Sequence, residues 1–236
     1  MFFVKWSKIL LHAFKKGYKL KKYKTIYCES QLVTNIKKSK FIATVSPTKN
    51  IEEALSFIKS MQKKYADATH NVFAFRVIDE NIFIERQSDD GEPSGTAGMP
   101  ILEVLRGESL LNITAVVTRY YGGTLLGTGG LNRAYGQTTK DAIKEIIEKA
   151  PYILYRLCVS YSQMGQIQYE IIKENHILYE TIYADNVEYL VYTKEEEGEN
   201  FLKRMIDLTG NNIKITEIKF DYGFWYNGKF MIDPIN

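Results

Sequence analysis

Glycine is concentrated in one part of this chain. Ten of the 16 glycines fall within residues 85–136, where they surround clusters of acidic and basic side chains. A glycine inside a helix or strand costs about 0.5–1 kcal/mol relative to alanine, so dense glycine marks places where the backbone turns sharply or approaches another group closely. This segment is therefore expected to form tight loops that contact a ligand.

Apolar periodicity in the first part of the chain predicts a mixture of helices and strands. Asn50 and Glu53 form a capping box at the start of an amphipathic helix. A helix that begins near Leu131 is expected to end before Pro151, with the domain boundary at Ala150-Pro151. The elements expected in this first domain, residues 25–151, are strands at 39–45, 72–78, 82–88 and 113–118 and helices that begin near residues 51, 100 and 131.

The second domain, residues 152–236, follows the order β-α-β-β-α-β, which is the ferredoxin-like pattern. The alternation of apolar and polar residues slips between Ile215 and Ile218, so a β-bulge is expected there. The expected strands cover residues 156–160, 177–183, 187–193 and 213–220, and the expected helices carry Met164, Ile167 and Ile171 or Phe201, Leu202 and Met205.

Charge is distributed unevenly along the chain. Residues 1–24 hold eight lysines and no acidic residue, residues 25–155 are neutral, and residues 156–236 have an excess of five acidic residues. The basic tail at residues 1–24 has three interpretations: a translation-start artefact with the true start at Leu20, a solvated disordered tail, or an amphipathic helix on anionic lipid. Beyond the tail, only a local cluster of Lys and Arg could bind nucleic acid.

The sequence indicates a cytoplasmic protein. No apolar run approaches the ~20 residues of a membrane span. Cys28 and Cys158 lie far apart and match no metal or redox spacing. We therefore predict no membrane span, no metal and no cofactor, and the sequence does not indicate an oligomeric state.

An acidic loop at residues 88–96 places Asp89, Asp90 and Glu92 close together. Oxygen ligands of this kind can hold a divalent cation, or they can orient hydroxyl and amine groups of a non-metal ligand. The third interpretation is a tight turn in which Asp90 and Ser94 bond their own backbone.

A glycine-rich segment at residues 122–130 joins a predicted strand to a predicted helix. Its spacing imitates a phosphate-binding loop, but Thr128 stands where that loop needs lysine. Helix N-termini still suit anions, and the planar guanidinium groups of Arg119 and Arg133 suit bidentate anion contacts. Alternatively, the glycines only allow close packing, and both arginines pair with the acidic loop.

His70 is the one histidine within these motifs. A hydrolytic triad of Ser94, His70 and Asp90 can be drawn, but Ser94 lacks the strand-turn-helix context of a nucleophile, so no catalytic residue is predicted. Instead we predict a ligand-binding pocket lined by His70, Arg76, Asp89, Asp90, Glu92, Arg119, Gly123, Gly129, Gly130 and Arg133.

Four strings of this sequence resemble the IMPACT family, in its two-domain bacterial YigZ-like branch: KKSKFIATVSP, DATHNVFAFR, SDDGEPSGTAGMPILEVL and VVTRYYGGTLLGTGGLNRAYG. The resemblance implies an N-terminal domain with the left-handed βαβ topology of a translation elongation factor domain and a ferredoxin-like C-terminal domain. It also implies a link to translation, because eukaryotic members resemble regulators that act under amino-acid starvation.

The sequence therefore favours a non-catalytic, translation-linked regulator, or a ligand- or RNA-binding protein, with an anion-accepting pocket on the N-terminal domain. Its expected partners are a protein of the translation apparatus, RNA or a small anionic ligand. The alternative is a small metal-dependent hydrolase or phosphoryl-transfer enzyme that uses the same pocket with Mg²⁺. A third hypothesis is RNA binding by aromatic side chains on a sheet face, which the acidic charge of the C-terminal domain disfavours.

Overall fold

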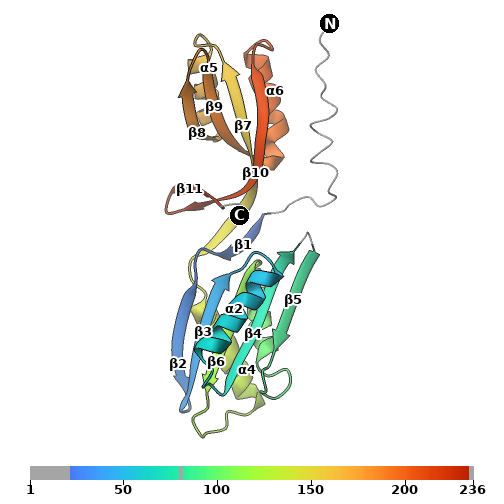
Figure 1. Cartoon of the computed structure of the whole chain (residues 1–236), viewed down its shortest axis with the longest axis vertical. Coiled ribbons are helices and arrows are strands. Elements are labelled where there is room, and N and C mark those ends of the chain that lie inside the picture. Colours follow the sequence, from blue (N-terminus) through green and yellow to red (C-terminus); the bar gives the residue numbers. More distant parts are fainter. Residues whose placement is uncertain (1–21, 80–81, 234–236) are drawn as a thin grey trace.

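The structure, a computed structural model, describes residues 22–79 and 82–233. It contains two α+β domains placed end to end (Figure 1), which confirms the predicted fold class. Most of the predicted basic tail and the turn at residues 80–81 lie outside the described residues. The first strand begins at Tyr23, so the last residues assigned to the tail belong to the fold.

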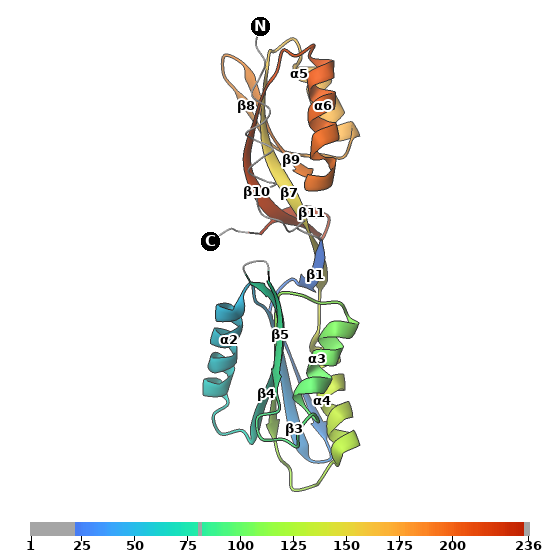
Figure 2. The same cartoon turned by 90° about the vertical axis from the view of Figure 1, so that its right-hand side faces the viewer.

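The N-terminal domain is built on an antiparallel sheet with the strand order β2-β3-β6-β4-β5. Helix α2 covers one face of this sheet, and α3 and α4 cover the other (Figure 2). Since β3 and β4 both run antiparallel to β6, they are parallel to each other and α2 is the crossover between them. The elements are β2 (Ser30–Ile36), β3 (Ser39–Pro47), α2 (Ile51–Lys64), β4 (His70–Asp79), β5 (Ile82–Ser88), α3 (Gly98–Gly107), β6 (Ile113–Tyr120) and α4 (Thr128–Ala142).

Local sequence signals explain several of these elements. The Asn50 half of the predicted capping box is present, because the side chain of Asn50 accepts from the backbone N–H of Glu53 at 2.8 Å. The Glu53 carboxylate in turn accepts from the backbone N–H of Lys49 at 2.6 Å. The uninterrupted apolar run of β6 is buried at nearly every position, as expected for the central strand of a sheet covered on both faces.

The C-terminal domain has the ferredoxin-like strand order β10-β7-β9-β8, with β11 added beyond β10. Both of its helices lie on one face of the sheet (Figure 2). The predicted bulge is present, because the pairing of β10 with β7 shifts between Glu217 and Lys219. The elements are β7 (Ile146–Val159), α5 (Met164–Lys173), β8 (Ile177–Tyr183), β9 (Val187–Lys194), η1 (Glu195–Glu197), α6 (Gly198–Leu208), β10 (Lys214–Tyr226) and β11 (Lys229–Ile232).

The prediction of a helix up to Pro151 is wrong. Helix α4 ends at Ala142, and residues 146–150 begin strand β7, which continues through Ala150-Pro151 without a break. The physical reason is a distant partner, because Ile146–Lys149 pair with Tyr23–Ile26 of β1. The buried and exposed positions alternate along this part of β7, as a strand requires.

Strand β1 (Tyr23–Ile26) joins the two domains. It pairs with β7, and its Lys24 carbonyl accepts from the backbone N–H of Leu111 at 2.8 Å. The Ile26 side chain is buried in the core of the N-terminal domain. Towards the other domain, the Tyr23 ring packs edge-on against Tyr222 of β10. A strand that lies far in sequence from its partners in β7 and β10 therefore fixes the joint between the two domains.

We predict that Ile26→Ala lowers the free energy of unfolding by about 2–5 kcal/mol, because it deletes a fully buried side chain. Urea denaturation measures the change. Val33→Ala, on the half-exposed edge strand β2, is the matched control and should cost less than about 0.5 kcal/mol. Equal effects of the two substitutions would contradict the role assigned to β1.

Candidate functional site

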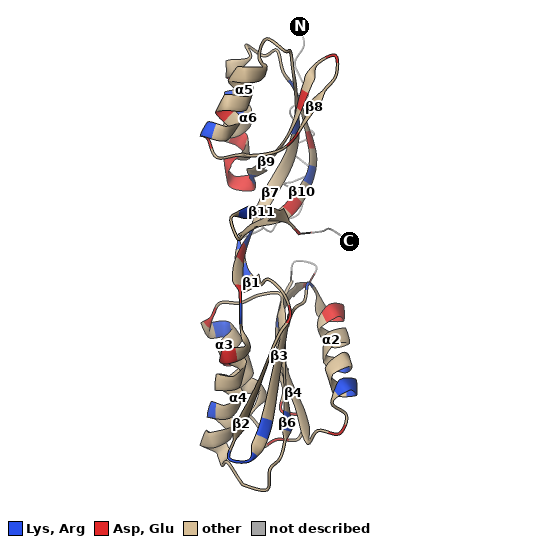
Figure 3. Cartoon of the chain, turned by 90° about the vertical axis from the view of Figure 1, so that its left-hand side faces the viewer, with Lys and Arg blue, Asp and Glu red and all other residues tan. Residues whose placement is uncertain are grey.

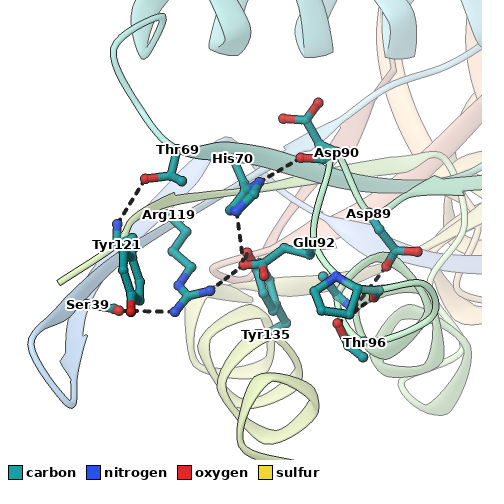
Figure 4. Close-up of polar contacts among 12 residues, drawn as sticks. Ser39, Thr69, His70, Asp89, Asp90, Glu92, Thr96, Arg119, Tyr121 and Tyr135 are labelled. Carbon is teal, nitrogen blue, oxygen red and sulfur yellow. Dashed lines mark hydrogen bonds and ion pairs between the residues drawn. The ribbon is translucent and has the colours of Figure 1, made fainter. Parts of the chain in front are cut away.

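A buried polar cluster lies beneath the acidic loop (Figure 4). One carboxylate oxygen of Glu92, Oε1, accepts from Nη1 of Arg119 at 2.6 Å and from the hydroxyl of Tyr135 at 2.7 Å. All three side chains are buried. Nε2 of the half-buried His70 lies 3.8 Å from the same oxygen. The charge of Glu92 is therefore matched inside the protein rather than by solvent.

Sheet register places Arg119 at the centre of this cluster. It stands near the end of β6, directly between Phe41 of β3 and His70 of β4. Its Nη2 donates to the Ser39 hydroxyl at 3.2 Å, and the backbone N–H of Gly122 donates to the same oxygen at 3.3 Å. Arg119 thus links the acidic loop to the start of the glycine-rich segment.

Tyr135 enters the cluster from α4. Burial and the hydrogen bond to Glu92 raise the pKa of Tyr135 far above the ordinary value of a phenol. Its hydroxyl therefore stays protonated and remains a hydrogen-bond donor to the carboxylate. The cluster thus places a neutral donor beside the ion pair of Arg119 and Glu92.

The acidic loop is held by its own aspartates. The Asp89 carboxylate accepts from the backbone N–H groups of Gly95 at 2.8 Å, Ala97 at 3.0 Å and Gly98 at 2.8 Å. Burial opposes ionisation of Asp89, but these three donors outweigh it and lower the pKa of the carboxyl group. The loop is thus bonded internally, as the tight-turn interpretation expects, but through Asp89 rather than through Asp90 and Ser94.

Asp90 instead binds the start of β4. Its carboxylate accepts from the backbone N–H of Asn71 at 2.6 Å. Its backbone carbonyl lies 2.7 Å from Nδ1 of His70, and since a carbonyl can only accept, Nδ1 carries the proton of this bond. His70 is thereby oriented with Nε2 towards Glu92.

The glycine-rich segment packs against a lysine-rich turn. A Cβ atom on Gly122 would lie 2.0 Å from the carbonyl oxygen of Lys38, so only glycine fits there. Helix α4 then starts after Gly127, whose φ of +71° is left-handed, and no side chain caps this helix terminus. We call the surface formed by Lys37, Lys38, Lys40, Tyr121 and residues 122–130 the distal end, because it lies farthest from the C-terminal domain (Figure 1).

The structure brings together only part of the predicted pocket. His70, Asp90, Glu92 and Arg119 meet in the cluster, and Asp89 lies beside them in the loop. The glycines Gly123, Gly129 and Gly130 belong to the adjoining distal end.

Two predicted residues lie apart from the cluster. Arg76 is placed farther along β4, where it pairs with Glu85 at 3.2 Å and donates to the carbonyls of Leu105 and Leu110. Arg133 is exposed on α4, and it makes no hydrogen bond or ion pair with the residues that the structure describes. The two arginines flanking the glycine-rich segment therefore have different environments, one buried and one facing solvent.

Sequence reasoning did not identify Ser39 or Tyr135 as members of the cluster. Ser39 looked like the first residue of a strand, and Tyr135 looked like part of the apolar stripe of a helix. Both are buried and both bond to the Arg119–Glu92 pair. Their polar atoms become informative only once the partner strands are known.

Within residues 22–79 and 82–233, no three His, Cys, Asp or Glu side chains are grouped so that they could hold a metal ion. None of the described helices is both long and apolar enough to cross a membrane.

Comparison with known proteins gives matches along most of the chain. The Impact N-terminal domain matches residues 37–143, and a domain of unknown function (DUF1949) matches residues 157–212. The chain is 40% identical over 189 residues to the IMPACT family member YvyE of Bacillus subtilis (strain 168), covering 79% of this chain and 87% of that protein. It is 42% identical to the IMPACT family member YigZ of Escherichia coli (strain K12), covering 58% of this chain and 69% of that protein.

A eukaryotic relative and a solved structure also match this chain. Protein IMPACT of Rattus norvegicus is 35% identical over 95 residues, which is 39% of this chain and 29% of that protein. A crystal structure of a hypothetical protein has a TM-score of 0.55 and 31% sequence identity, and covers 85% of this chain and 99% of its own. The match to the crystal structure therefore extends over both domains.

Replacement of Asp89 by Ala should destabilise the protein by about 1–3 kcal/mol, because three backbone donors lose a charged acceptor. The pKa of Asp89 is lower in the folded than in the unfolded chain, so its contribution is complete above the unfolded pKa of about 3.9. It is lost as the pH falls through the folded pKa. Unfolding free energies of the wild type and Asp89→Ala should therefore converge in acid, and a constant difference down to pH 2 would refute this.

Glu92→Gln should cost about 3–5 kcal/mol of stability, since it leaves the buried Arg119 guanidinium without a counter-charge. Arg119→Met on the Glu92→Gln background should recover part of that loss, because no unpaired charge then remains buried. A double-mutant cycle measured by chemical denaturation tests the coupling. Additive effects would show that the two groups are energetically independent.

Proposed function

Because this chain belongs to the IMPACT family, we propose that it is a cytoplasmic, translation-linked protein that binds RNA through the distal end of its N-terminal domain. The contact is to the phosphate backbone. Neither a metal nor a cofactor takes part in it.

The observation that carries this proposal is the lysine turn packed beside the uncapped start of α4. Lys37, Lys38 and Lys40 are exposed, and the carbonyl of Lys38 touches the glycine-rich segment. Helix N-termini present unpaired backbone N–H groups and a partial positive charge, which favour phosphate. Basic side chains supply the long-range attraction to a polyanion. Figure 3 shows the basic residues at this end of β3 and its turn.

The acidic loop opposes this attraction less than its three carboxylates suggest. The charge of Glu92 is matched by the buried Arg119, whereas Asp89 keeps its charge and is held by three backbone donors. Asp90 accepts from the backbone of β4. The same bonds use both carboxylate oxygens of Asp89 and one oxygen each of Glu92 and Asp90. Fewer oxygens are left as ligands for the Mg²⁺ of an enzyme, so RNA binding is favoured over that alternative.

Arg119 has a positioning role in this proposal. It is 4% exposed and is bonded to Glu92 and Ser39, so it does not face a ligand. Through Ser39 it fixes Gly122 and therefore the path of the glycine-rich segment. Arg133, which is exposed in the first turns of α4, is the arginine available to a phosphate.

The proposal predicts a change in salt dependence. Lys37→Gln with Lys38→Gln should weaken binding of a 12-nucleotide single-stranded RNA and reduce the slope of log K against log salt by about 0.7 per lost phosphate contact. Fluorescence anisotropy over a salt series measures the slope. The matched control is Lys140→Gln with Lys144→Gln, two exposed lysines at the opposite end of α4. Identical slopes for the two double variants would refute the assigned surface.

A further inference from the structure

The sheet of the C-terminal domain has one face without a helix. Helices α5 and α6 cover the side that carries Leu157 and Tyr189 (Figure 2). The opposite side carries a second apolar cluster that includes Leu154 and Tyr192. No helix in the described part of the chain lies over that cluster. We call this side the open face.

A row of aromatic rings crosses the open face. Ring centroids are 5.6 Å apart between Trp225 and Phe230, 5.8 Å between Phe230 and Tyr192, and 5.5 Å between Tyr192 and Tyr179. The row therefore passes from β10 and β11 to β9 and β8. Its two ends are accessible, since Trp225 is 55% and Tyr179 is 60% exposed. Two large aromatic side chains are thus presented to solvent on a rigid sheet.

The acidic excess of the domain lies on its helical elements and in its loops rather than on its strands. Its helical elements, α5, η1 and α6, contain six acidic and three basic residues. Strands β7 to β11 contain five acidic and six basic residues. Net charge therefore gives no reason to exclude a polyanion from the sheet.

Basic side chains flank the aromatic row on the open face. The Lys219 amine pairs with the buried Asp221 carboxylate at 2.8 Å, and that carboxylate also accepts from the Tyr192 hydroxyl at 2.7 Å. Arg156 lies 3.6 Å from Glu188. Lys219 and Arg156 nevertheless remain about half exposed, so both can approach a phosphate.

We propose that the open face stacks the bases of single-stranded RNA on Trp225 and Tyr179, with Lys219 and Arg156 beside the backbone. Unpaired bases stack on aromatic side chains with little sequence preference, because every base has a π-face. The proposal rests on the proposed function in that the same RNA also contacts the distal end. It goes further by assigning base contacts to the C-terminal domain.

Tryptophan fluorescence tests the stacking directly. The chain has two tryptophans, so Trp6→Phe leaves Trp225 as the single reporter in the full-length protein. A 12-nucleotide oligouridine should quench Trp225, whereas an abasic ribose-phosphate oligomer of the same length should not. Equal quenching by both oligomers would mean that the backbone alone is bound, and the proposal would be overturned.

The affinity of substituted proteins for oligouridine provides a second test of the stacking. Trp225→Ala or Tyr179→Ala should each raise the Kd for oligouridine by roughly 5- to 150-fold, which corresponds to the usual value of one stacked base. Tyr169→Ala is the matched control, because Tyr169 is 64% exposed but lies on α5. It should leave the Kd unchanged. An unchanged Kd in both open-face variants would overturn the stacking proposal.

The two RNA-binding surfaces can be separated. Lys37→Gln with Lys38→Gln should reduce the salt slope but leave Trp225 quenching at saturating oligouridine intact. If quenching persists while the salt slope is unchanged, the proposal for the distal end fails and the proposal for the open face stands.

Native mass spectrometry tests whether the open face instead binds a second copy of this chain. A wild-type dimer that becomes a monomer on Trp225→Ala would make the open face an interface between copies and overturn the proposal.

Discussion

The buried ion pair between Arg119 and Glu92 is the interaction on which the N-terminal domain depends. Removing two charges from water costs several kcal/mol per ion, and only short bonds with further hydrogen bonds repay that cost. Here the 2.6 Å pair is completed by Tyr135 and Ser39. A well-packed apolar pair could stabilise the fold equally well. We therefore attribute to the charged pair a role in positioning the elements around it rather than a gain in stability. It ties the acidic loop, the central strand, α4 and the glycine-rich segment to one another.

The sequence identified most of the charged residues around this ion pair but not the partner of each one. Asp89, Asp90 and Glu92 are adjacent in the chain, yet one caps a loop, one binds β4 and one is buried. Sequence proximity cannot separate such roles, because they depend on which strand lies opposite. Arg76 lies outside the cluster for the same reason. The observed register of β4 with β5 places it opposite Glu85, with which it pairs.

For the fold as well, predictions that rested on local signals succeeded, and a prediction that depended on a distant partner strand failed. The helix cap at Asn50, strand alternation and the bulge in β10 are local signals, and the structure confirms them. The helix predicted beyond residue 142 failed because Ile146–Lys149 become a strand only beside β1, more than 100 residues away in sequence. The family resemblance supplied the two-domain topology. It could not supply this joint, since the matched strings begin after β1.

Net charge was the least informative sequence property, for the same physical reason. The effect of a charge on a partner depends on its exposure and on the charges around it, and both depend on the fold. The N-terminal domain is neutral in sequence, but its acidic loop is internally bonded and its lysine turn is free to face a polyanion. The C-terminal domain is acidic, but its excess lies on the helical elements and in the connecting loops and leaves the sheet nearly balanced. Each domain therefore offers a surface that its average charge would hide.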